Sequence, residues 1–188
     1  MLEPQAALFQ LLCANLTLNN LNQVNARNAA VGSKEGSIVV PTVNYSTSGN
    51  FGSLSLSATD NSDAGHTVPL ITLDEYIHIA QCALIKIDVE GMECDVLRGG
   101  RNFIDKFKPY IFVENDRPDK SDSLIELILS LGYNPYWCVT SLYNPDNFAA
   151  DQENIFPGIV VQNMFCIHRF RNIDASNLQA AQPKASRQ

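Results

Sequence analysis

Apolar and polar positions follow two periodic patterns along the chain, and these patterns predict an ordered series of helices and strands. Apolar residues after Pro4 recur at helical spacing up to Leu18, and a later helical face ends where Gly132 follows Leu131. Short runs of β-branched and aromatic residues between turn signals predict strands. The expected strands cover residues 24–31, 36–40, 51–56, 83–89, 110–114, 134–140 and 163–168, and the expected helical segments cover 4–18, 73–80, 92–107 and 124–131.

The order of these elements predicts the fold class. Strands that alternate with helices indicate an α/β fold, with a mostly parallel sheet and helices on both of its faces. The last two strands have no helix between them, which predicts an antiparallel C-terminal strand pair at one edge. Residues 1–170 are expected to form the folded domain, and the polar residues 171–188 a flexible tail.

The charge of the chain indicates which binding partners are disfavoured, and its cysteine content indicates the cell compartment. The chain carries 13 Lys and Arg against 20 Asp and Glu, a net charge of −7, which disfavours binding to nucleic acid and to anionic lipid. No apolar run reaches the about 20 residues that a membrane span needs, and the first residues lack a secretory signal pattern. Five cysteines without a C-x-x-C pair predict free thiols in a reducing compartment, so we expect a cytoplasmic location.

Charged residues occur in the segment Leu84–Gly91, where a buried parallel strand is expected to be apolar on both faces. Lys86, Asp88 and Glu90 fall on one side of this strand. Burial of such groups costs several kcal/mol per ion as an order of magnitude, so Asp88 and Glu90 are expected at the carboxyl end of the strand, where open α/β sheets bind ligands. The structural alternative is that Lys86 pairs with Asp88, while Glu90 and Glu93 stabilise the next helix.

Two further acidic positions lie at predicted strand ends. One strand ends in Glu114 and Asn115, which together with Asp88 place three oxygen ligands of the kind that Mg²⁺ accepts. Alone, this sequence also fits a turn before Pro118. Glu3 lies between a presumed strand end and a helix, where an acidic residue holds ribose hydroxyls in nucleoside-binding folds, or simply favours the helix N-terminus.

Several segments of the chain together resemble one known family. They are residues 86–93 with Gly99–Gly100, residues 68–77, Lys108–Pro109 leading to Glu114, Glu3–Pro4, residues 15–20 and residues 28–32. In these segments the chain resembles the FkbM-type methyltransferases. The resemblance implies a Rossmann-like sheet and S-adenosylmethionine-dependent O-methylation of hydroxyls on sugars, glycolipids or secondary metabolites. The implied partner is therefore a small-molecule or saccharide acceptor.

The resemblance also implies roles for individual residues. Glu3 would hold the ribose of S-adenosylmethionine, and the adenine would lie beside Ala29, Ala30 and Val31. Asp88, Glu90 and Glu114 would face the acceptor hydroxyl, with Asp88 as the preferred base. A metal site is the less favoured alternative, so Mg²⁺ is not the expected cofactor; its ligands would be Asp88, Glu114 and Asn115.

The resemblance is incomplete before Glu3. Family members carry a strand and a Gly-rich loop ahead of the matching acidic residue, and the sequence has neither. We therefore expect a sheet that lacks its N-terminal strand or strands, and S-adenosylmethionine binding that is weak or absent. The alternative to an active enzyme is a non-catalytic interaction domain derived from a methyltransferase.

Overall fold

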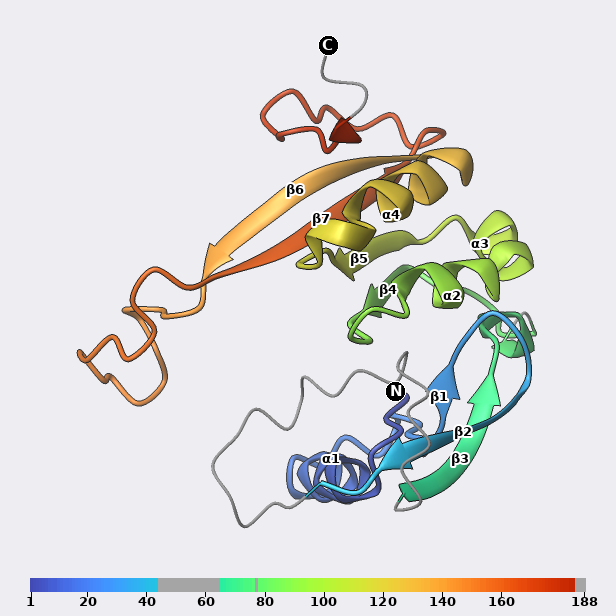
Figure 1. Ribbon diagram of the computed structural model, residues 1–188, viewed down its shortest axis with the longest axis vertical. Helices are drawn as coiled ribbons and strands as arrows, with labels where there is room; N and C mark the ends of the chain where they lie inside the picture. The colour runs from blue at the N-terminus through green and yellow to red at the C-terminus, as the bar shows by residue number, and fades with distance from the viewer. Residues whose placement is uncertain (44–64, 77, 185–188) are drawn as a thin grey trace. The chain divides into compact units, whose positions relative to one another are not determined.

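The computed structural model describes residues 1–43, 65–76 and 78–184, which divide into two compact units. The first unit contains Met1–Ala80 and Val89–Lys106, and the second contains Gln81–Asp88 and Phe107–Gln188. Figure 1 shows the helices and strands with their labels. The strand expected over residues 51–56 lies outside the described residues.

The first unit contains a small mixed sheet with the strand order β1-β3-β2. Strand β1 (Ala30–Val31) runs parallel to β3 (Gly65–Ile71), and β2 (Gly36–Pro41) runs antiparallel to β3. Ala30, Val40 and Val68 form its buried core. The strand expected over 24–31 is shorter than predicted. Only its last two residues join the sheet, and residue 27 forms a single parallel bridge to residue 2.

The helices of the first unit follow the predicted segments with changed boundaries. Helix α1 (Ala6–Leu18) confirms the first expected helix, although none of its residues is fully buried. A short 3₁₀ helix, η1 (Leu73–Tyr76), stands where a longer helix was expected. The segment 92–107 forms two helices, α2 (Glu93–Arg98) and α3 (Arg101–Phe107). Within the described ranges, no helix has both the length and the apolar character needed to cross a membrane.

Two contacts hold α2 and α3 in the first unit. The Asp74 carboxylate accepts hydrogen bonds from the Phe103 backbone N–H and the Asn102 side-chain amide, both at 2.8 Å. It therefore satisfies a backbone donor near the start of α3 that the helix itself leaves unpaired. A Cβ atom on Gly99 would lie only 2.0 Å from the Gly32 carbonyl oxygen. Only glycine therefore allows the turn between the helices to approach the end of β1 so closely.

The second unit contains a four-stranded sheet with the order β4-β5-β7-β6. Strands β4 (Leu84–Ile87) and β5 (Tyr110–Glu114) are parallel. Strands β7 (Val160–His168) and β6 (Tyr133–Ser141) continue the sheet in antiparallel pairs. Helix α4 (Pro118–Ser130) buries one apolar face, made of Leu124, Ile125, Leu127 and Ile128. The sequence predicted the apolar face that includes Leu124, Ile125 and Ile128, whereas the helix begins at Pro118, earlier than the expected residue 124.

The α/β class and the antiparallel C-terminal strand pair are confirmed. Both sheets mix parallel and antiparallel neighbours, so a mostly parallel sheet is not confirmed. Residues after β7 follow the outer edge of β6: the Trp137 N–H donates to the Gln179 carbonyl at 2.8 Å, and the Ala181 N–H donates to the Pro135 carbonyl at 2.9 Å. The domain limits at 170 and the flexibility of residues 171–188 stay predictions.

Candidate functional site

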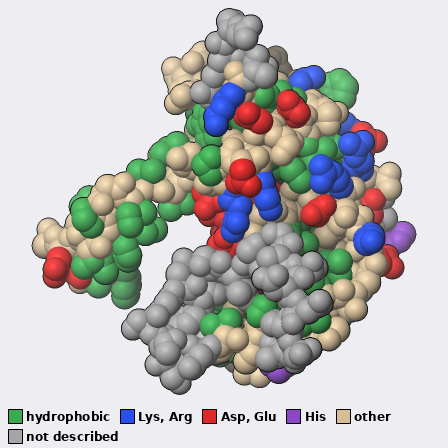
Figure 2. Space-filling view, in the orientation of Figure 1, with side chains coloured by type: hydrophobic (Ala, Val, Ile, Leu, Met, Phe, Trp, Pro, Cys, Tyr) green, Lys and Arg blue, Asp and Glu red, His purple; other side chains and the backbone are tan. Residues whose placement is uncertain are grey.

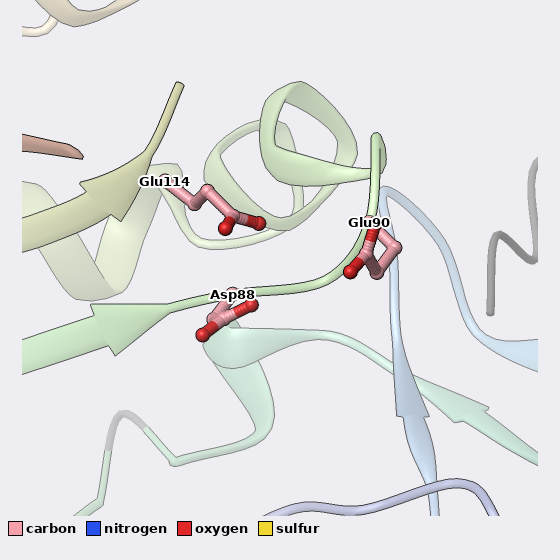
Figure 3. Close-up of side chains that lie close together, drawn as sticks. All are labelled: Asp88, Glu90 and Glu114. Atoms are coloured by element: carbon pink, nitrogen blue, oxygen red, sulfur yellow. The ribbon is translucent and has the colours of Figure 1, made fainter. Parts of the chain in front are cut away.

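Two carboxylates meet at the carboxyl ends of neighbouring parallel strands in the second unit. Ile87, the last residue of β4, is in register with Val113 of β5, so the next residues along the chain are Asp88 and Glu114. Oxygen atoms of these two carboxylates lie within 4.8 Å of each other. Figure 3 shows the two side chains at the ends of their strands. The structure therefore brings together two of the three residues proposed for the acceptor site.

Glu90, the third of these residues, follows Asp88 by two positions and belongs to the first unit. Its backbone φ is 52°, and that of Gly91 is 97°, so two consecutive residues with positive φ follow the end of β4 at a distance of two residues. A non-glycine residue in this region costs on the order of 1 kcal/mol. The chain therefore turns sharply just beyond Asp88, and Figure 3 shows Glu90 on this turn.

Lys86 forms an ion pair with Asp88, with the Nζ and Oδ2 atoms 2.5 Å apart. Their side chains are 59% and 47% exposed, so this pair contributes at most about 1 kcal/mol to stability. This contact is the one that the structural alternative for the segment predicted. Its main consequence for the site is positional, because it places a positive charge beside Asp88.

Glu93 is a buried carboxylate whose interaction the sequence did not indicate. Only 6% of the residue is exposed, and its Oε1 accepts a hydrogen bond from the Gly91 N–H at 2.7 Å. It thereby holds the turn that follows Asp88. Its place in the first turn of α2, two residues after Gly91, was the available signal, but that signal does not distinguish a buried carboxylate from an exposed one.

Asn115 is not brought to the carboxylate pair. Consecutive residues of an extended strand point to opposite faces, so Asn115 points away from the side of Glu114. Asn115 is 5% exposed, and its Nδ2 donates to the Met164 sulfur at 3.3 Å. It also lines a separate cavity of about 190 Å³ beside the start of α4, together with Pro118, Ser121, Asp122, Ile125 and Trp137.

Glu3 is fixed in the first unit by backbone contacts. Its N–H donates to the Arg27 carbonyl at 3.2 Å, and the Asn28 side-chain amide donates to the Glu3 and Pro4 carbonyls at 2.8 and 3.0 Å. The Glu3 Oε1 atom accepts a hydrogen bond from the Gln5 N–H at 2.7 Å. Partial burial raises the pKa of Glu3, and the bond from Gln5 offsets part of this rise.

Of the three residues expected beside the adenine, Ala30 and Val31 form β1, and Ala29 directly precedes this strand. Ala29 and Ala30 are 0% and 3% exposed, whereas the side chain of Val31 is partly exposed. The alanine side chains belong to the core and cannot contact a ligand without rearrangement. Of the three, only Val31 offers a side-chain surface, while the others set the position of the strand.

In open α/β sheets ligands bind at the carboxyl ends of the strands, which is where Asp88 and Glu114 lie in this chain. Residues 1–135 match the family model described as the methyltransferase FkbM domain. The chain therefore belongs to the FkbM methyltransferase family. Comparison with curated protein sequences finds no match.

The chain is also similar to a solved structure, the crystal structure of methyltransferase FkbM from Methylobacillus flagellatus KT. The two sequences are 18% identical, and the TM-score is 0.52. The similarity covers 88% of this chain and 35% of that chain. At this identity the likeness concerns the fold, and this chain corresponds to about a third of the solved one.

Proposed function

We propose that the chain is an S-adenosylmethionine-dependent methyltransferase that methylates a hydroxyl of a sugar, glycolipid or secondary metabolite. Family membership supports methyl transfer. The observation that carries the proposal is the pair of carboxylates, Asp88 and Glu114, at the ends of β4 and β5. The parallel pairs β4–β5 and β1–β3 are the parts that a Rossmann-like arrangement would share.

The proposed role of the carboxylate pair is to orient and deprotonate the acceptor. A hydroxyl oxygen becomes a good nucleophile when a positioned base removes its proton. Oxygens separated by up to 4.8 Å can both accept hydrogen bonds from one hydroxylated ligand that lies between them. Asp88 is the more exposed of the two, and we assign it the base role, with Glu114 as an additional acceptor.

Lys86 makes a metal ion the less favoured alternative. Two carboxylates this close repel each other, and a positive charge between or beside them relieves the repulsion. Lys86 already supplies such a charge at Asp88. A Mg²⁺ ion held by Asp88 and Glu114 would have to compete with it and would lack Asn115 as a third ligand.

The residues around Glu3 fit the ribose end of the cofactor. When bound, S-adenosylmethionine supplies a methyl group on a positively charged sulfur that is already electrophilic. Among the residues that the structure describes, the Glu3 Oε2 atom receives no hydrogen bond, whereas Oε1 is used by Gln5. A partly buried carboxylate oxygen with spare acceptor capacity suits a ribose hydroxyl. Val31 offers the nearby apolar side-chain surface for the adenine.

Cofactor binding is tested with S-adenosylhomocysteine and saturation-transfer NMR, which detects weak ligands. We expect binding, because the Glu3 Oε2 atom can accept a hydrogen bond from a ribose hydroxyl. Glu3→Gln should weaken it at least tenfold, whereas Glu35→Gln, an exposed carboxylate of the same unit, should leave it unchanged. No binding by a folded sample would contradict the cofactor assignment and favour the interaction-domain alternative.

The acceptor chemistry is tested by transfer of a labelled methyl group to a panel of hydroxylated acceptors. Asp88→Asn should lower turnover by about 10² or more, the usual contribution of a general base. Asp119→Asn, which neutralises an exposed carboxylate at the start of α4, is the matched control and should have no effect. Unchanged turnover in the Asp88 variant would remove this residue from the mechanism.

A further inference from the structure

The segment between β6 and β7 exposes an unusual amount of apolar surface. We call residues 139–160 the arm, because they extend from the shared end of the two strands (Figure 1). Figure 2 shows hydrophobic side chains gathered along it. Seven large apolar side chains of the arm are between 39% and 108% exposed: Val139, Leu142, Phe148, Ile155, Phe156, Ile159 and Val160. Contiguous apolar surface of this kind marks an interaction site.

The arm holds its shape through its own polar contacts. The Leu142 N–H donates to the Ile159 carbonyl at 3.0 Å, and the Tyr143 hydroxyl donates to the Asp151 carbonyl at 3.0 Å. The Asn147 side-chain amide donates to the same carbonyl at 2.7 Å. Phe148, at 108% exposure, is therefore presented outward from an organised loop.

The arm is acidic as well as apolar. It contains Asp146, Asp151 and Glu153, all exposed, and no Lys or Arg. Negative charge disfavours insertion into anionic lipid, and it also disfavours contact between two arms. A suitable partner surface therefore combines exposed apolar side chains with positive charge.

The second unit carries such a surface at its other end. We call it the basic patch; it comprises residues 169–173 and Lys108. Phe170 and Ile173 are 83% and 45% exposed, and the Lys108 Nζ atom lies 6.0 Å from the centre of the Phe170 ring. The charged members of the patch are Lys108, Arg169 and Arg171, and the one acidic neighbour in sequence is Asp174.

The arm cannot reach the basic patch of its own chain. The loop of the arm, residues 142–159, lies beyond the Ser141–Val160 pair, whereas the patch begins after His168, at the opposite end of the β6–β7 pair. Nine paired residues at about 3.4 Å each separate the two by roughly 30 Å. Two copies in antiparallel orientation would instead place each arm beside the patch of the other copy.

We propose that the arm docks on the basic patch of a second copy of this chain, in a two-fold dimer with two equivalent contacts. Because both contacts form at once, the arrangement closes and gives a dimer rather than a filament. Exposed apolar area supplies the attraction, and the opposite charges select this pairing over arm-to-arm contact. The proposal does not depend on methyl transfer.

The test measures self-association of the full chain by analytical ultracentrifugation at several concentrations and salt levels. The wild type should form dimers that weaken as salt increases, since salt screens the charge pairs. An arm variant with Phe148→Ser and Ile155→Ser, and a patch variant with Phe170→Ser, should each raise the dimer dissociation constant at least tenfold. All three side chains are exposed, so the fold should be retained, which circular dichroism checks.

Mixing the two variants separates this proposal from other contacts. The arm variant keeps an intact patch and the patch variant keeps an intact arm, so the mixture should form a one-to-one complex with one of the two contacts. The control Leu18→Ser, on the exposed face of α1, should leave the dimer unchanged. The proposal would be overturned if the wild type stays monomeric at all concentrations, or if the mixture of the two variants forms no complex. It would also be overturned if the control loses the dimer, or if the wild type binds phosphatidylcholine vesicles as tightly as it binds a second copy of itself.

Discussion

The close approach of Gly99 to Gly32 gives the sharpest stability prediction for the first unit. Gly99 has φ −75° and ψ −2°, a conformation that alanine adopts without strain. The full cost of Gly99→Ala is therefore steric. The new Cβ atom would lie 2.0 Å from the Gly32 carbonyl oxygen, whereas ordinary contact begins at 3.4 Å, so the backbone must separate by about 1.4 Å.

Such a displacement is large for a packed interior. Overpacking commonly costs about 1–3 kcal/mol and sometimes more, so we expect the free energy of unfolding to fall by about 3 kcal/mol. With a urea dependence of about 2 kcal/mol per molar, the unfolding midpoint should fall by about 1.5 M. Far-UV circular dichroism follows both units, whereas fluorescence of Trp137, the single tryptophan, reports the second unit alone.

Gly36 provides the matched control, because a Cβ atom there would meet nothing within 4 Å. Gly36→Ala should change the unfolding free energy by less than about 0.5 kcal/mol, the usual range for exposed sites. Equal midpoints for the Gly99 and Gly36 variants would refute the close approach, and with it the packing of the α2–α3 turn against β1.

Three further predictions concern single side chains. Asp74→Ala leaves the Phe103 N–H without its acceptor and should cost about 1–2 kcal/mol in urea unfolding. Burial raises the pKa of the Cys166 thiol and excludes reagents, so alkylation followed by mass spectrometry should modify partly exposed cysteines such as Cys13 in the folded chain and Cys166 only on unfolding. The pKa of Glu3 is raised in the folded state, so its contribution to stability is present at acid pH and is lost as pH rises through that pKa. The Glu3→Gln variant should therefore lose less unfolding free energy than the wild type when the pH is raised from acid to neutral.

Each of these predictions has a direct counter-test. Asp119→Ala removes an exposed carboxylate from the first turn of α4, and an effect as large as that of Asp74→Ala would contradict the capping role. If Cys166 in the folded chain is alkylated as fast as Cys13, its side chain is accessible to the reagent and not buried. A pH profile of the Glu3 variant identical to that of the wild type would show that Glu3 does not titrate differently on folding.

Helical periodicity and strand composition predicted most elements of the second unit, but they did not predict the strand β3 of the first unit. Pro69 lies within this strand, and proline usually argues against a central position because it lacks an N–H donor. The structure tolerates it because β1 pairs only with Leu70 and Ile71, so residue 69 lies beyond the end of that neighbour. The short length of β1 depends on side-chain contacts such as those of Asn28, which the periodic pattern does not encode.

The candidate site shows which inferences a strand-end rule supports. The rule placed Asp88 and Glu114 together because adjacent parallel strands end at the same edge of a sheet. The rule also assigned Glu114 and Asn115 to the same metal site, although consecutive strand residues point to opposite faces. Applied together, the edge rule and the alternation rule would have excluded Asn115 from a shared metal site. The cavity that it lines near α4 depends on tertiary packing and has no signal in the local sequence.

The residues that carry the family resemblance divide into two physical roles. Glu93 and Gly99 fix turns of the first unit, through a hydrogen bond to Gly91 and a backbone approach that admits no side chain. Asp88 and Glu114 bring like charges close together at the sheet edge, and Lys86 offsets the charge of Asp88. Like charges that are held close together are expected at positions where a protein binds or transforms a ligand. This contrast is the physical reason for proposing Asp88 and Glu114 as the residues that act on the acceptor.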